Sequence, residues 1–252
     1  MSNSSPALAI AVVPAGDPPT RRGIDLLERW KDSLRLCERP GPAPGATACS
    51  SPDANGEIDG LVHPDAVPPP TSVDAELPAI NWTAVVDDEA RDHFFERSLG
   101  HRRIRLLFRS GWIQSELMAF NTRERLRVIA HDPKRHRLMG RLVSKAKDHA
   151  REELVREIRA LSLGALAKPV TRRKHANVLE NVAEILAGGM TGAEREAIAS
   201  AVQVYAGGRH ALWPVLCLLR EEAQRQGLIG LAGQSYLDPD PLERALRFEP
   251  KR

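Results

Sequence analysis

Cysteine and aromatic side chains are both scarce in this sequence. Its 252 residues include 3 cysteines, which lie far apart and form no Cys-x-x-Cys pair. This pattern excludes a disulfide framework and a four-cysteine metal site, so we expect a reducing cytoplasmic location and neither a metal nor another cofactor. Aromatic residues make up 4% of the chain. That scarcity argues against a β-sandwich or barrel, because aromatic and β-branched side chains line the strands of such folds.

Long apolar runs are also missing. No stretch approaches the roughly 20 apolar residues that a membrane-spanning helix needs. The run from Ala7 to Val13 is apolar but short, no positive residue precedes it, and Pro14 follows it directly. A secretory signal peptide has a charged start and a longer apolar core. We therefore expect neither a signal peptide nor contact with a membrane.

The N-terminal third is rich in residues that disfavour regular structure. Residues 1–20 and 38–80 are dominated by Pro, Gly, Ala, Ser and Asp. Proline removes a backbone donor and fixes an extended dihedral. Segments of this composition bury too little apolar surface to offset the entropy lost on ordering. We predict that residues 1–85 form a mostly disordered tail.

One segment of this tail carries a helical pattern. Ile24, Leu27, Trp30 and Leu34 recur at intervals of three and four, which predicts a short helix over residues 22–36. A single helix of this length is marginal in water, so its apolar face needs a surface to cover it. That surface is either the rest of the chain or a partner protein.

The remainder of the chain carries the start and stop signals of helices. Asp132-Pro133 is an N-cap followed by proline at the first helical position, and Thr191-Gly192-Ala193-Glu194 is a capping box. No alternating apolar and polar run of strand length occurs, and no internal repeat has a fixed period. The predicted fold class is all-α: a single bundle of six or seven helices over residues 86–247.

The net charge of +3 conceals a strong local imbalance. Residues 91–175 contain 22 Lys and Arg against 9 Asp and Glu, a balance of +13. Residues 1–80 contain 6 against 11, a balance of −5. Such a local excess of positive charge attracts polyanions. It is also typical of a solvated helical face, so charge alone leaves both interpretations open.

Several short motifs follow one another in the helical region. They are Phe94-Phe95-Glu96-Arg97, Ala119-Phe120-Asn121-Thr122-Arg123, His131-Asp132-Pro133-Lys134, Lys174-His175-Ala176-Asn177-Val178-Leu179 and Gln234-Ser235-Tyr236-Leu237-Asp238-Pro239. In this combination the sequence resembles the YbgA-like family, a bacterial domain of unknown function, over roughly residues 92–241. The resemblance implies an all-helical fold. Some members are fused behind an iron–sulfur desulfidase domain that acts on thiolated pyrimidines, including 4-thiouridine in tRNA, and there the YbgA-like part is implied to hold the tRNA.

The chain lacks the cysteines that such an iron–sulfur cluster needs. The resemblance therefore implies an accessory role beside a separately encoded enzyme, such as an RNA desulfidase. The sequence also departs from the family pattern. Asn121 stands where a histidine is common, and His136 stands where a tyrosine is usual.

Our leading prediction is an RNA-binding module, specific for tRNA, without catalytic activity of its own. Arginine outnumbers lysine in the basic segment, which suits bidentate contacts with phosphate. A run of three cations at a helix start opposes the helix dipole, and a bound phosphate would offset that cost. The residues predicted to contact nucleic acid are Arg123, Arg125, Lys134, Arg135, Arg141, Thr171, Arg172, Arg173, Lys174, His175 and Asn177.

Two alternatives remain at this point. His131 and His175 are candidates for the acid and base of an enzyme that acts on a small anionic or nucleotide substrate. Histidines at helix ends more often make structural hydrogen bonds, and their spacing here fits no metal motif. A third reading is an interaction scaffold whose basic face meets an acidic protein.

Overall fold

The computed structural model describes residues 7–12, 18–38, 58–63, 65, 77–109 and 111–248. The chain divides into two compact units. Unit 1 comprises Met1–Leu106 together with Pro241–Arg252, and unit 2 comprises Leu107–Asp240. The C-terminal segment therefore returns to the unit in which the chain begins.

Unit 1 contains a small parallel β-sheet. Its strands are β1 (Leu8–Val12), β2 (Leu34–Glu38), β3 (Gly60–His63) and β4 (Ala79–Asn81), in the order β2-β1-β3-β4. The strand β1 lies in the middle and pairs in parallel with both β2 and β3. Every residue of β1 is buried. A continuous apolar run of this kind is typical of a strand that is covered on both faces.

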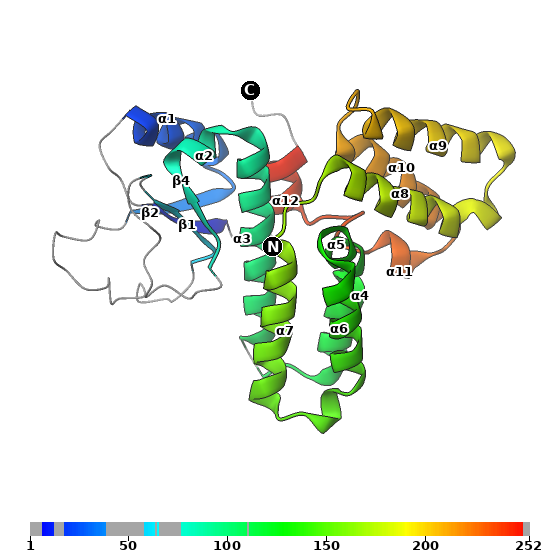
Figure 1. Cartoon of the computed structure of the whole chain (residues 1–252), viewed down its shortest axis with the longest axis horizontal. Coiled ribbons are helices and arrows are strands. Elements are labelled where there is room, and N and C mark those ends of the chain that lie inside the picture. The colour runs from blue at the N-terminus through cyan, green and yellow to red at the C-terminus, as the bar shows by residue number, and fades with distance from the viewer. Residues whose placement is uncertain are drawn as a thin grey trace, which may run out of the picture. The chain divides into compact units, whose positions relative to one another are not determined.

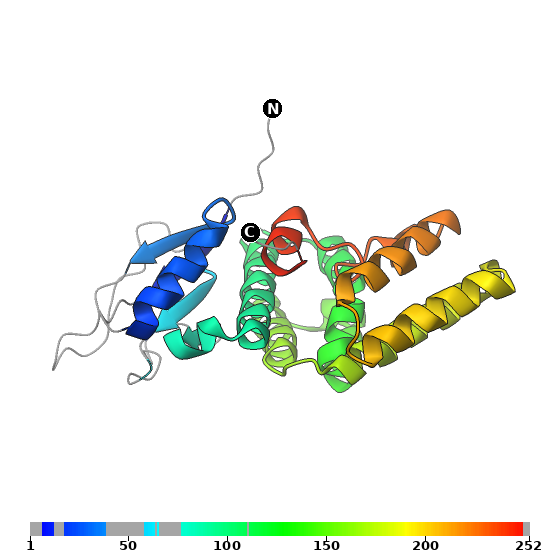
Figure 2. The same ribbon diagram turned by 90° about the horizontal axis from the view of Figure 1, so that it is seen from above.

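The helices of unit 1 complete its core. The segment between β1 and β2 contains α1 (Pro18–Leu27) and the 3₁₀ turn η1 (Glu28–Trp30), and Figure 2 shows α1 running alongside the strands. After β4 come α2 (Trp82–Val86) and α3 (Asp88–Phe108), and the C-terminal segment adds α12 (Pro241–Glu243) and η4 (Arg244–Phe248), a π-helical turn. The largest members of the shared core are Leu8, Ile10, Leu27, Trp30, Trp82, Phe94, Phe95, Leu99, Leu242 and Leu246.

The sheet corrects the all-α prediction. The structure is mostly helical, but four strands lie in the segment that we predicted to be a tail. Parallel strands that are buried on both faces show short apolar runs without alternation, so a search for alternating patterns does not detect them. The predicted disorder at residues 1–6, 13–17, 39–57, 64 and 66–76 lies outside the described residues.

The predicted helix over residues 22–36 is shorter and begins earlier. It starts at Pro18, passes into η1, and gives way to β2 at Leu34. Leu27, Trp30 and Leu34 are buried in the core of unit 1, and Ile24 packs against that core. The apolar spacing is thus explained by packing within the chain.

Ion pairs tie α3 to the rest of unit 1. Arg105 donates to the Oδ1 atom of Asp59 at 2.8 Å, and the Oδ2 atom of Asp59 accepts from the backbone of Ala9 at 3.0 Å. Arg103 donates to Glu243 of α12 at 3.1 Å. Arg103 and Arg105, which count toward the positive balance of residues 91–175, are therefore used for packing within unit 1.

Unit 2 is entirely helical over its described residues. Its elements are α4 (Gln114–Arg123), α5 (Arg125–His131), α6 (Pro133–Ser144), η2 (Ala146–Asp148), α7 (Arg151–Leu166), α8 (Arg172–Leu186), η3 (Ala187–Gly189), α9 (Gly192–Ala206), α10 (Leu212–Arg225) and α11 (Ile229–Ala232). Figure 1 shows α4, α6 and α7 as one group and α8, α9 and α10 as another. The short helix α5 contacts α6, α7 and α8, so it joins the two groups.

The predicted helix starts in unit 2 are confirmed. Asp132 caps α6 with Pro133 at its first position, and the side chain of Thr171 caps α8. Thr191 and Glu194 form the capping box of α9. Across the described ranges, none of the helices combines the length and the apolar character needed to cross a membrane.

Candidate nucleic-acid interface

The ends of four helices of unit 2 meet around one carboxylate, that of Asp132. This residue follows α5 and precedes α6, and its Oδ1 atom accepts from the backbone N–H groups of Lys134 at 3.0 Å and Arg135 at 3.2 Å. Its Oδ2 atom lies 2.5 Å from Nζ of Lys168, which follows α7. The hydrogen bond from Lys168 and those from the backbone lower the pKa of Asp132 below its ordinary value, against an opposing effect of burial.

The start of α8 adds another cation to this position. Nζ of Lys174 lies 3.5 Å from the carbonyl oxygens of His131 and Pro169. Nε of Arg135 lies 3.5 Å from Oδ2 of Asp132. Two cationic side chains, those of Lys168 and Arg135, thus pair with a single carboxylate where α6 and α8 both begin, and the ammonium group of Lys174 lies against the adjoining backbone. We call Asp132, Lys134, Arg135, Lys168 and Lys174 the Asp132 cluster.

A glycine of α7 makes room for one member of this cluster. Arg135 donates to the carbonyl oxygen of Ala160 at 3.1 Å. A Cβ atom added to Gly164 would lie 2.5 Å from Nη1 of Arg135. The missing side chain at position 164 therefore lets the guanidinium lie close against α7.

Exposed cations continue from the cluster along α6. Lys134, Arg137 and Arg141 are all exposed, and their spacing of three and four places them on one face of the helix. Burial lowers the pKa of His136 below its ordinary value, and the positive charges of Arg125 and Arg137 lower it further. Both arginines therefore lie close to His136, and Arg125 extends the positive surface onto α5.

The other predicted contact residues divide between the surface and the scaffold. Arg123, Arg173 and Asn177 are exposed. Arg172 donates to the carbonyl oxygens of Tyr205 and His210, each at 3.2 Å, and its guanidinium lies 4.9 Å from the centre of the Tyr205 ring. It thus fastens the start of α8 to the end of α9, while the Thr171 hydroxyl accepts its capping bond from Lys174.

The two candidate catalytic histidines are buried and have different partners. Nδ1 of His131 donates to the carbonyl oxygen of Lys168 at 2.6 Å. Nδ1 of His175 shares a hydrogen bond of 2.7 Å with the hydroxyl of Tyr236, and the two rings stack. The exposed fractions are 2% for His131 and 9% for His175. These contacts brace helix ends, and they favour the structural interpretation of both residues.

Two residues were assigned incompletely from the sequence. Lys168 is not among the predicted contact residues, although it approaches Asp132 more closely than the predicted cations do. Arg127, which counts toward the positive balance of residues 91–175, is 2% exposed and donates to the carbonyl oxygen of Ser235 at 2.7 Å. Among the side chains that the structure describes, no group of three His, Cys, Asp or Glu is arranged to hold a metal ion.

Comparison with known families bears on this same unit. Residues 125–241 match the model of a family described as a protein of unknown function (DUF1722). The DUF1722 match begins at the first residue of α5 and runs through α11, so it contains the whole Asp132 cluster. Searches of the curated proteins and of the solved structures found no match.

Proposed function

We propose that unit 2 binds RNA, specifically tRNA, through the Asp132 cluster and the exposed cations of α6. One observation carries this proposal: Lys168 and Arg135 both pair with one carboxylate, that of Asp132, and the ammonium group of Lys174 lies against the adjoining backbone at the start of α8. Holding like charges together costs free energy, and a bound anion offsets that cost. The starts of two helices at the same position add the positive ends of their dipoles.

The extent of the positive surface favours a polyanion over a single phosphate. Arg141 lies seven residues after Lys134 in the exposed row on α6, which is about 10 Å along a helix. A row of this length contacts several phosphates along a strand. Binding of this kind releases counterions, so we expect a steep dependence of affinity on salt.

The choice of RNA rests on two further supports. The motifs of this chain resemble the YbgA-like family, some of whose members are joined to an enzyme that acts on thiolated tRNA. Arg173 and Asn177 are exposed one turn apart on α8, and such side chains can contact phosphates and the 2′-hydroxyl groups by which RNA differs from DNA. We propose that the protein presents tRNA to a separately encoded cytoplasmic enzyme, such as an RNA desulfidase.

Competition binding with the full chain tests the proposal. Labelled bulk tRNA would be bound at about 150 mM salt and then displaced with duplex DNA or heparin at equal phosphate or sulfate concentration. We expect a dissociation constant in the micromolar range or below, and weaker displacement by either competitor than by unlabelled tRNA. Equal displacement by heparin would indicate a general polyanion or acidic-protein surface, and absence of binding would refute the proposal.

A further inference from the structure

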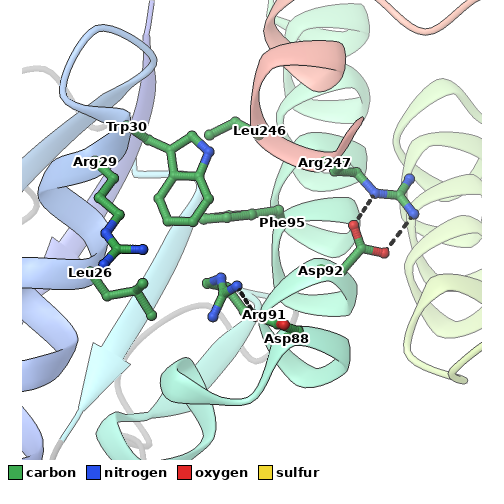
Figure 3. Close-up of a pocket in the computed structure, with 9 residues that line it drawn as sticks. All are labelled: Leu26, Arg29, Trp30, Asp88, Arg91, Asp92, Phe95, Leu246 and Arg247. Carbon is green, nitrogen blue, oxygen red and sulfur yellow. Dashed lines mark hydrogen bonds and ion pairs between the residues drawn. The ribbon is translucent and has the colours of Figure 1, made fainter. Parts of the chain in front are cut away.

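A cavity of about 360 Å³ lies within unit 1, and all the residues that line it belong to that unit. It is enclosed by the end of α1, η1, the first turns of α3, and η4 (Figure 3). This volume is near the lower end of the range for small-molecule sites. The cavity is therefore of a size to hold one ring with a few substituents.

The walls of this cavity are partly aromatic. The rings of Trp30 and Phe95 meet edge to face, with their centres 5.6 Å apart. Leu26 and Leu246 add aliphatic surface on two sides. These groups suit a planar apolar body, because ring edges and faces pack favourably against aromatic side chains.

The acidic groups of the cavity already have partners. Both carboxylate oxygens of Asp92 accept from Arg247, each at 2.9 Å. Asp88 forms an ion pair with Arg91. Each of the two carboxylates thus already has an arginine partner within the protein.

The remaining capacity consists of donors. Nε1 of Trp30 is buried and has no hydrogen-bond partner among the described residues, and the residue is 7% exposed. Arg29 is exposed, and Figure 3 shows its guanidinium directed into the cavity. The guanidinium of Arg91 also lies over the Trp30 ring, 5.3 Å from its centre.

We propose that this cavity binds a small aromatic carboxylate. The negative charge lies near Arg29, and the ring packs against Phe95 and Leu246. A cation beside an aromatic wall recognises this combination of groups, whereas a neutral or cationic ring leaves Arg29 without a counter-charge. The inference is independent of the RNA-binding proposal, because every residue involved belongs to unit 1.

The test is a titration of the ¹⁵N-labelled full chain with 4-hydroxybenzoate in the absence of RNA. The indole N–H signal of Trp30 is the reporter, and it is assigned by its loss in Trp30→Phe. We expect a saturable shift of this signal with a dissociation constant below about 1 mM. The uncharged isostere 4-hydroxybenzamide should bind at least about tenfold more weakly.

Two arginine variants separate the site from general charge effects. Arg29→Gln should weaken binding of 4-hydroxybenzoate by about tenfold or more, because it removes the cation at the cavity. Arg22→Gln, an exposed position on the preceding helix α1 that does not line the cavity, should leave the affinity unchanged. No saturable shift up to about 10 mM, or equal affinity in Arg29→Gln and Arg22→Gln, would overturn the proposal.

Discussion

Lys168 and Asp132 are 36 residues apart in the sequence, and their side chains meet at 2.5 Å at the junction of α5, α6, α7 and α8. Asp132 has two roles there. Its Oδ1 atom caps α6, and its charge offsets part of the positive charge of Arg135 and Lys168. These roles can be separated, because an asparagine caps a helix about as well as an aspartate does.

Asp132→Asn should therefore have opposite effects on stability and on binding. We expect a loss of about 1 kcal/mol of stability, since Lys168 and Arg135 lose their shared partner. We also expect tRNA to bind several-fold more tightly, because a negative charge leaves the interface. Thermal unfolding and binding at low salt measure the two effects. The control is Asp238→Asn, which removes a charge paired with Arg220 in the same unit. If Asp238→Asn gained as much tRNA affinity as Asp132→Asn, the effect would come from total charge.

The pKa of His136 reports directly on the positive surface. Burial, Arg125 and Arg137 hold this pKa below its ordinary value, so bound tRNA should raise it by bringing phosphates near these cations. Arg137→Gln should also raise it in the free protein, whereas Arg195→Gln on α9 should not. An NMR titration of the histidine ring signals gives these values. An unchanged or lower pKa of His136 in the complex would contradict binding at this surface.

The lowered pKa of His136 also has a consequence for stability. Because its folded pKa lies below its unfolded pKa, the unfolded chain takes up the proton first as the pH falls. The contribution of His136 to the free energy of unfolding is complete above the unfolded pKa of about 6.5. It decreases as the pH drops toward the pKa of the folded state. We expect His136→Gln to reduce the decline in denaturation midpoint between about pH 7 and pH 5. An identical decline in the variant would show that other groups cause it.

Two glycine substitutions should change stability in opposite directions. A Cβ atom at Gly60 would lie 2.5 Å from Oγ of Ser98 and 2.8 Å from the Phe94 ring, both buried. Gly60→Ala should therefore cost about 1–3 kcal/mol through overpacking. Gly140 lies within α6, where an added Cβ meets nothing within 4 Å, so Gly140→Ala should stabilise by about 0.5–1 kcal/mol. Denaturant unfolding checks both signs, and a neutral Gly60→Ala would mean that β3 and α3 pack less tightly than described.

The buried Arg247 should contribute far more to stability than an arginine whose acidic partner is half-exposed. Its side chain is 4% exposed and pairs with Asp92, Glu96 and Glu243. Arg247→Met leaves these carboxylates without their shared cation, so we expect a loss of about 3–5 kcal/mol. Arg220→Met removes a pair whose acidic partner, Asp238, is half-exposed, and should cost about 1 kcal/mol or less. If urea unfolding showed equal losses of stability in Arg247→Met and Arg220→Met, the ion pairs of Arg247 would contribute little to the free energy of unfolding.

The helix starts of unit 2 could be predicted because their signals are local. Asp132-Pro133 and the Thr191 to Glu194 box each fix a helix start with a few consecutive residues. The sheet could not be predicted in this way, since β1 is a short, fully buried run whose pairing partners lie at Leu34 and Gly60. The connections between the strands are rich in proline and glycine, and this composition led to the prediction of a disordered tail.

The candidate site was predicted only in part for a similar reason. Charge counting selects cations but does not show which of them are already paired. Arg127 and Arg172 are used to fasten the fold, whereas Lys168 reaches Asp132 through the packing of α7 beside α5 and α6. The value of each cation for binding depends on these tertiary contacts.

The most direct test of the central claim compares two triple variants of the full chain in tRNA binding across a salt series. One carries Lys134→Gln, Lys168→Gln and Lys174→Gln; the other carries Lys145→Gln, Lys147→Gln and Arg195→Gln, all exposed positions outside the Asp132 cluster. Both lose three positive charges, and circular dichroism confirms that both fold. If the cluster binds RNA, the variant that lacks its three lysines loses at least about tenfold in tRNA affinity. The slope of log affinity against log salt for this variant falls by about 2 in magnitude, whereas the matched variant changes little in either quantity. Equal losses in the two variants, or none in either, would contradict the account.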